Sequence, residues 1–147
     1  LQRPESRGTV LIRSSDPMAA PEIDPNYFER DIDLHTMRDG VKIGRKIFAQ
    51  KAFDPYRADE YAPGDKIQSD DEIDDWIRQN VDSNYHLSGT CKMGVDDMAV
   101  VDEKLRVHGL GGLRVVDASV MPTVVSGNTN AATIMIAERG ADFALSD

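Results

Sequence analysis

The longest stretch of regular hydrophobic spacing predicts an amphipathic helix from Asp31 to about Phe53. Apolar residues recur there every three or four positions, which places them on one face of a helix. Pro55 ends this helix, because proline cannot donate a backbone hydrogen bond and its ring clashes with the preceding turn. The predicted apolar face consists of Leu34, Met37, Val41, Gly44 and Phe48, with Ile47 beside them.

A second helix is predicted from its start signal. Ser69-Asp70-Asp71-Glu72 is a capping box, in which the serine oxygen accepts from the third helical N–H and the glutamate reaches back to the cap. Ile73, Trp76 and Ile77 then form an apolar stripe on a helix that runs to about Val81. Trp76 could instead act as a platform for a substrate, but its spacing favours core packing.

Short strands are predicted on either side of these helices. Thr9 to Arg13 is β-branched and apolar, as strands are, whereas Ser14 to Pro25 is typical of an irregular crossing punctuated by proline. Leu105 to His108 and Leu113 to Val116 indicate two further short strands around a glycine-rich loop. Asp117 follows the second of them, at a strand end, where α/β folds tend to place ligand contacts.

Two polar segments carry candidate chemistry. Tyr85–Gly94 contains a lone imidazole, His86, ahead of a Ser-Gly-Thr turn, and is poor material for a core. Ser126–Ile136 is a glycine-polar turn that opens an apolar helix, which we expect to cover Asn130 to Leu145 with Gly140 as a weak point. The first segment offers a base that titrates near neutrality, and the second offers a helix N-terminus, where partial positive charge collects. A site that uses both would place a proton acceptor beside a position for developing negative charge.

The composition limits the partners of the chain. Of its 147 residues, 40% are hydrophobic and 29% are charged, which is typical of one soluble globular domain. The formal net charge of −9 argues against a nucleic-acid partner, which would favour a basic face. No apolar run approaches the roughly 20 residues of a membrane-spanning helix. We therefore expect a cytoplasmic protein, with peripheral attachment to the cytoplasmic membrane as the alternative.

Neither a disulfide nor a metal site is expected. Cys91 is the only cysteine, so it has no partner within the chain, and a small buried spacer is its expected role. His35 and His108 have no companion at the spacing of metal ligands, so no metal is assigned.

The two polar segments resemble the C-terminal signatures of the glucose-methanol-choline (GMC) family of flavin oxidoreductases, and most of all those of its choline-oxidising members. The likeness continues through further motifs, in the right order, over nearly the whole chain. These motifs are Ser6–Val10, Ser15–Pro17, Val101–Asp102, Leu105–Leu110, Gly112–Pro122 and Asn128–Asn130. Several motifs in order make a far more specific signal than any one of them.

The resemblance implies an α+β fold, in which the family's C-terminal substrate domain combines an antiparallel sheet with packed helices. We expect residues 1–104 to form this substrate-binding domain. Residues 105–147 would be a strand and helix that return to the FAD-binding domain. That domain lies N-terminal to the matching region in the family, and the chain has no G-x-G-x-x-G motif in strand–helix context. We therefore expect a fragment of a larger enzyme, which by itself binds FAD poorly and is inactive.

Site residues are carried over from the family position by position. His86 matches the histidine that takes the hydroxyl proton while hydride passes to flavin N5; without the resemblance, it would be an imidazole that caps a turn. Asn128 matches a position held by His or Asn, where an amide donates to the substrate oxygen; the alternative is a plain turn before a helix. Asp117 and Ala118 match a pair that contacts the flavin, and Asn130 matches a residue whose backbone approaches flavin N1 and O2.

The resemblance also implies a substrate and partners. The expected reaction is oxidation of choline to betaine aldehyde, with another primary alcohol as the alternative substrate and a quinone chain or oxygen as electron acceptor. Tyr56, Tyr61 and Tyr85 are candidates, by composition, for an aromatic cage around the ammonium group. Leu87 replaces a proline common in the family, which would hold the backbone of the histidine less tightly. The alternative function is a stand-alone, non-catalytic binding or regulatory domain, and self-association as a homo-oligomer is left open.

Overall fold

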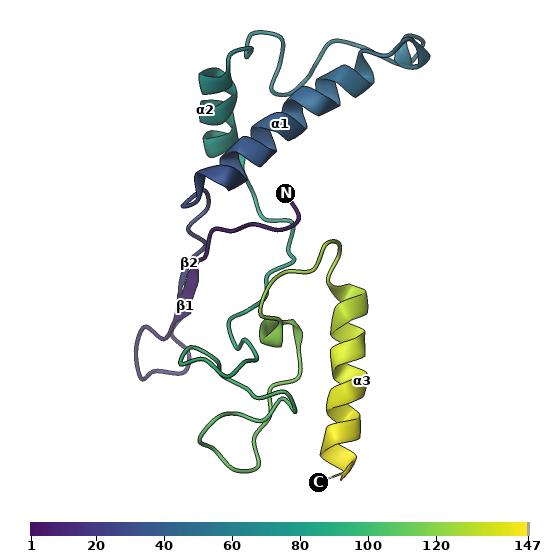
Figure 1. Ribbon diagram of the computed structural model, residues 1–147. Helices are drawn as coiled ribbons and strands as arrows, with labels where there is room; N and C mark the ends of the chain where they lie inside the picture. Colours follow the sequence, from purple (N-terminus) through teal and green to yellow (C-terminus); the bar gives the residue numbers. More distant parts are fainter. Residues whose placement is uncertain (147) are drawn as a thin grey trace. The chain divides into compact units, whose positions relative to one another are not determined.

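Helix α1 (Asp31–Phe48) packs against helix α2 (Asp70–Asn80) in the computed structural model, which describes residues 1–146 (Figure 1). Both helices belong to the first of two compact units, which consists mainly of residues 25–82. The core of this unit is formed by Leu34 of α1 with Ile73 and Ile77 of α2, and Trp76 packs against it half-buried. Core packing of the predicted stripe, Trp76 included, is confirmed.

The start of α2 is the predicted capping box. Ser69 Oγ accepts from the Glu72 N–H at 3.3 Å, and the Glu72 carboxylate accepts from the Ser69 N–H at 2.9 Å. Between the helices, the Arg38 guanidinium of α1 donates to Asp74 of α2 at 2.7 Å, with both side chains mostly shielded from solvent. The prediction of the box is confirmed because it depends only on groups within one turn of the chain.

The end of α1 differs from the prediction. The helix ends at Phe48 rather than Phe53, because Gln50 is extended (ψ 143°) and the chain resumes only as a 3-10 turn, η1 (Lys51–Phe53). The Arg57 guanidinium donates to the Phe48 carbonyl at 2.8 Å and so satisfies one of the acceptors that a helix end leaves open. Phe48 is 59% exposed, so the C-terminal end of the predicted apolar face is not buried.

One buried acid on α1 ties the N-terminal segment to this unit. Asp33 is only 2% exposed, and its carboxylate accepts from the backbone N–H groups of Glu5 and Ser6 at 2.8 Å and from the Ser6 hydroxyl at 2.5 Å. Burial by itself would raise the pKa of Asp33. The hydrogen bonds from Ser6 and Glu5, together with the charge of Arg7, outweigh burial and hold the pKa below its ordinary value.

The second unit contains a two-stranded antiparallel hairpin. The unit comprises residues 2–4, 9–24 and those from Ser83 onward. The strands of the hairpin are β1 (Thr9–Leu11) and β2 (Glu22–Asp24). The strand predicted for Thr9 to Arg13 is therefore shorter than expected. The prediction that Ser14 to Pro25 is wholly irregular is wrong. Glu22–Asp24 form a strand because they pair with β1, although their sequence carries no strong strand signal.

The prediction of two strands around the glycine-rich loop is wrong. Leu105 to His108 and Leu113 to Val116 are joined by the isolated bridge Arg106↔Arg114, without a continuous ladder. Leu105 has a left-handed backbone (φ 63°), which interrupts the extended conformation that a strand needs.

Helix α3 (Asn130–Ser146) agrees with the predicted last helix, and it contacts the short turn η2 (Ala118–Val120) in the second unit. Gly140 is buried, and a Cβ at this position would lie 2.4 Å from Val116 Cγ1, so the weak point of the helix is a site of close packing. The core of the unit consists of Val101, Leu105, Val120, Met121 and Ile136.

The α+β class is confirmed: over residues 1–146 the chain has one two-stranded antiparallel sheet and three α-helices. The chain passes for the last time from the first unit to the second between Asp82 and Ser83. The domain boundary expected at 104/105 stays a prediction. Within the described range, no helix combines the length and apolar character needed to cross a membrane.

Candidate functional site

The structure brings the two polar segments together within the second unit. His86 Nδ1 lies 3.0 Å from the Thr129 hydroxyl oxygen, although the two residues are 43 positions apart. The imidazole is half-buried, and Thr129 is 9% exposed. Asn128 and Asn130 flank Thr129 in sequence and are exposed. A titratable ring is therefore held directly against the turn that opens α3.

Backbone contacts secure the segment that carries His86. The Cys91 N–H donates to the Ser119 carbonyl at 3.0 Å, and the Met93 N–H donates to the Val120 carbonyl at 2.8 Å. These bonds attach the chain just after the histidine to η2. Cys91 lies within this pairing and is half-buried rather than fully buried, and its role as a spacer stays a prediction.

The residue before the imidazole has an unusual backbone. Tyr85 has a left-handed conformation (φ 59°), which a bulky side chain rarely adopts, and its N–H donates to Ser83 Oγ at 3.0 Å. Its side chain is 84% exposed. An exposed aromatic residue thus directly precedes His86 in the sequence.

The start of α3 is open to negative charge. The first N–H groups of a helix have no partner within it, and they carry partial positive charge. No acidic side chain lies in the first turn of α3 to neutralise it. The preceding Gly127 has φ 150°, which L side chains rarely adopt, so the turn into the helix requires glycine. Asn128 and Asn130 thus lie at an exposed helix N-terminus.

Asp117 and Ala118 lie at the start of η2. The Asp117 carboxylate accepts from the Ser119 N–H at 2.7 Å and caps the turn, while Ala118 packs against the core of the unit. Within residues 1–146, no hydrogen bond joins Asp117 to His86 or Thr129. The structure thus joins His86 to the turn that holds Asn128 and Asn130, whereas Asp117 makes its hydrogen bond within η2.

Thr129 is the residue that sequence reasoning missed. It precedes the first residue of α3, and its carbonyl accepts from the Thr133 N–H at 2.9 Å, as an N-cap residue does. Threonine is a preferred N-cap, so its place between two candidate asparagines was an available signal. That its hydroxyl contacts His86 could not be read from spacing.

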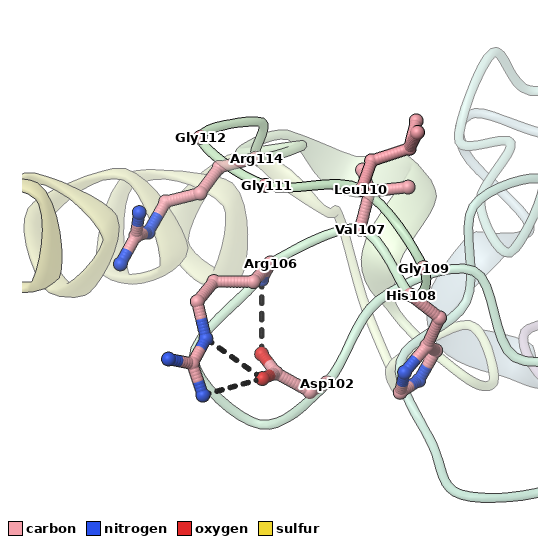
Figure 2. A pocket seen from close by; sticks show the side chains of 9 residues that line it. All are labelled: Asp102, Arg106, Val107, His108, Gly109, Leu110, Gly111, Gly112 and Arg114. Atoms are coloured by element: carbon pink, nitrogen blue, oxygen red, sulfur yellow. Dashed lines mark hydrogen bonds and ion pairs between the residues drawn. The ribbon is translucent and has the colours of Figure 1, made fainter.

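A hollow of about 550 Å³ lies elsewhere in the second unit (Figure 2). Asp102 and Arg106 face each other there, with two charge-assisted contacts of 2.9 Å from the guanidinium to one carboxylate oxygen. Burial would raise the pKa of Asp102, but hydrogen bonds from Arg106 and from the Lys104 N–H hold it below its ordinary value. None of the predicted site residues lines this hollow, whose remaining lining is Val107, His108, Gly109, Leu110, Gly111, Gly112 and Arg114.

His108 has a structural partner. Its Nε2 lies 3.0 Å from the Gly94 carbonyl oxygen, which can only accept, so this nitrogen carries the proton. Within the part of the chain that the structure describes, no group of three or more His, Cys, Asp or Glu side chains is arranged to hold a metal ion.

The chain is similar to known proteins over most of its length. The family model described as GMC oxidoreductase matches residues 4–137. The oxygen-dependent choline dehydrogenase of Yersinia pseudotuberculosis is 54% identical over 140 residues, which cover 95% of this chain and 25% of that protein. Two solved structures, each 36% identical over 99% of this chain with a TM-score of 0.92, are pyridoxine 4-oxidase from Mesorbium loti and an FAD-dependent oxidoreductase from Chaetomium thermophilum. The chain covers 28% and 25% of these two, so it spans about a quarter of the length of such relatives.

Proposed function

Because the chain belongs to the GMC oxidoreductase family, we propose that it is the C-terminal part of an FAD-dependent alcohol dehydrogenase that oxidises choline to betaine aldehyde. The observation that carries the proposal is the 3.0 Å contact between His86 and Thr129, since it holds an imidazole beside Asn128 and the start of α3. The identity to a choline dehydrogenase over most of the chain supports the substrate.

FAD is the cofactor of the family, and the residues present fit it. The N-terminus of α3, at Asn130, has no acidic side chain in its first turn and can stabilise a negatively charged ring edge. We assign the remaining contacts to Asp117 and Ala118, of which Asp117 is exposed beside η2. When bound, FAD supplies the acceptor for the hydride that leaves the alcohol carbon.

His86 acts as the base in this proposal. Its Nδ1 is occupied by Thr129, so its Nε2 is the nitrogen left to take the hydroxyl proton of the alcohol. The Asn128 amide donates a hydrogen bond to the same oxygen as negative charge develops there. Loss of one such donor typically costs about 3 kcal/mol of transition-state stabilisation. The base and the donor would approach one oxygen from two segments that the contact between His86 and Thr129 joins.

Tyr85 supplies part of the headgroup contact. Its exposed ring adjoins His86 in sequence, and an aromatic face attracts a quaternary ammonium group. The net charge of −9 further favours a cationic substrate over an anionic one. Tyr56 and Tyr61 are exposed but lie in the first unit, so Tyr85 is the candidate nearest to the base along the chain.

The wider setting of the chain is part of the same proposal. Residues 1–104 belong to the substrate-binding domain, and residues 105–147 return to the FAD-binding domain. The enzyme is cytoplasmic or peripheral to the cytoplasmic membrane, and it passes electrons to oxygen or to a quinone chain.

The visible spectrum of the full-length native protein tests the proposal. We expect a yellow protein, several times larger than this chain, whose flavin absorbance is bleached by choline under anaerobic conditions. A neutral primary alcohol of similar size is the control for the ammonium group. A yellow protein that choline leaves unbleached would overturn the substrate. A colourless protein of this chain's own mass would instead support a non-catalytic binding domain.

A further inference from the structure

We propose that Thr129 is a positioning residue that holds the His86 imidazole with its proton on Nδ1 and with the lone pair of Nε2 free. The direction of the hydrogen bond rests on the proposed function, whereas the contact between the two side chains does not. Three features of the second unit support the assignment: the contact between the two side chains, the burial of Thr129, and the anchoring of its backbone.

The contact is well placed to orient the ring. Nδ1 and Oγ1 are 3.0 Å apart, an ordinary length for an N–H donor and a hydroxyl acceptor. Thr129 is 9% exposed, so water has little access with which to replace the bond. The hydrogen bond at one ring nitrogen determines which of the two nitrogens carries the proton, so this contact determines whether Nε2 has a free lone pair.

The hydroxyl is carried by a rigid part of the chain. The Thr129 carbonyl accepts from both the N–H and the hydroxyl of Thr133, each at 2.9 Å, which fixes the first turn of α3. The side of the helix that bears Ile136 is packed in the core of the unit. An oxygen held in this way can set the rotation of a half-buried imidazole.

The direction of the bond follows from the proton balance. A neutral imidazole has one N–H and one lone pair. When Nδ1–H donates to Thr129, the Nε2 lone pair can take the alcohol proton: the O–H bond breaks, an Nε2–H bond forms, and the ring becomes imidazolium. Nδ1–H still donates to Thr129 afterwards, so one hydrogen bond serves both states without rearrangement. If the threonine donated instead, Nε2 would already carry a proton and could not act as the base.

Thr129 also links the base to the oxygen-binding amide. Asn128 is its immediate neighbour in the chain, so the residue that orients His86 and the residue that donates to the substrate oxygen share one peptide unit. We infer that this arrangement keeps the proton acceptor and the hydrogen-bond donor in a constant relation to a single substrate atom.

The test compares Thr129→Val, which keeps the shape and loses the hydroxyl, with Thr129→Ser, which keeps the hydroxyl. In the full-length enzyme with bound flavin, we expect Thr129→Val to lower kcat by roughly 10- to 100-fold with little change in KM, by analogy with the loss of a partner that orients a metal-bound histidine. Thr129→Ser should restore most of kcat. Thr129→Ala, which cannot clash, replaces the valine variant if that protein does not fold.

A second readout is independent of turnover. In the protein with 15N-labelled histidine, the ring signals of His86, assigned by their loss in His86→Gln, report which nitrogen is protonated. We expect Nδ1–H in the wild type and in Thr129→Ser, and a shift toward Nε2–H in Thr129→Val. An Nε2–H wild type, or a Thr129→Val protein with unchanged tautomer and kcat, would overturn the proposal. If the tautomer depends on Thr129 but no alcohol reduces the flavin, the positioning role stands and the proposed function fails.

Discussion

Gly140 offers a sharp test of how the second unit packs. It is buried in α3, and a Cβ there would lie 2.4 Å from Cγ1 and 3.0 Å from Cγ2 of Val116. Val116 is β-branched, so its χ1 has little freedom to move the methyl groups away. Gly140→Ala therefore combines a gain in helix propensity of about 1 kcal/mol with an overpacking cost of about 1–3 kcal/mol. We expect a net loss in the free energy of unfolding of about 1 kcal/mol.

Gly44 of α1 is the matched control, because a Cβ there would meet nothing within 4 Å. Gly44→Ala should raise the free energy of unfolding by about 0.5–1 kcal/mol, since only the propensity term applies. Urea unfolding of the native protein, followed by far-UV circular dichroism, measures both changes. Combining Gly140→Ala with Val116→Ala should remove the clash and reverse the sign at Gly140. If Gly140→Ala alone is as stabilising as Gly44→Ala, the close approach of α3 to Val116 is refuted.

Three further predictions concern the chemistry and the pH dependence of the protein. His86→Ala should lower turnover with choline by orders of magnitude while the flavin stays bound; unchanged turnover would remove His86 from the mechanism. Tyr85→Ala should raise KM for choline roughly tenfold but leave KM for a neutral primary alcohol nearly unchanged, as steady-state assays with both substrates would reveal. The pKa of Asp33 is lowered on folding, so its contribution to stability is present above the ordinary value of 3.8 and is lost as pH falls through the lower folded value. Asp33→Asn should thus flatten the acid side of a stability–pH curve, and an unaltered curve would contradict the buried hydrogen bonds to Ser6.

Predictions that rest on neighbouring residues agree with the structure. The capping box at Ser69 and the helix that starts at Asn130 each involve groups within a turn or two of one another. Such interactions act in the same way whatever the rest of the chain does, because they pair backbone groups that the helix itself leaves open. The family likeness was equally accessible, since it consists of ordered motifs in the chain.

Predictions that needed a partner distant in the chain were wrong or incomplete. β2 was missed because a strand of three exposed residues forms only where β1 supplies its hydrogen bonds. Asp33 has the sequence character of a solvated helix residue, yet it is buried because the N-terminal segment returns to it with two N–H groups and a hydroxyl. α1 keeps its predicted start but ends early, because Arg57 and the extended Gln50 intervene.

The candidate site shows the same division. The sequence alone determined which residue types are available: an imidazole in a polar segment, two asparagines at a helix start, and a motif order typical of one family. Only the tertiary structure decided that His86 meets Thr129, because that contact joins residues 43 positions apart and depends on η2 holding the Cys91 segment in place. Local hydrogen bonds are encoded within a few residues, whereas the tautomer of a catalytic imidazole depends on whichever oxygen the whole fold brings to its other nitrogen.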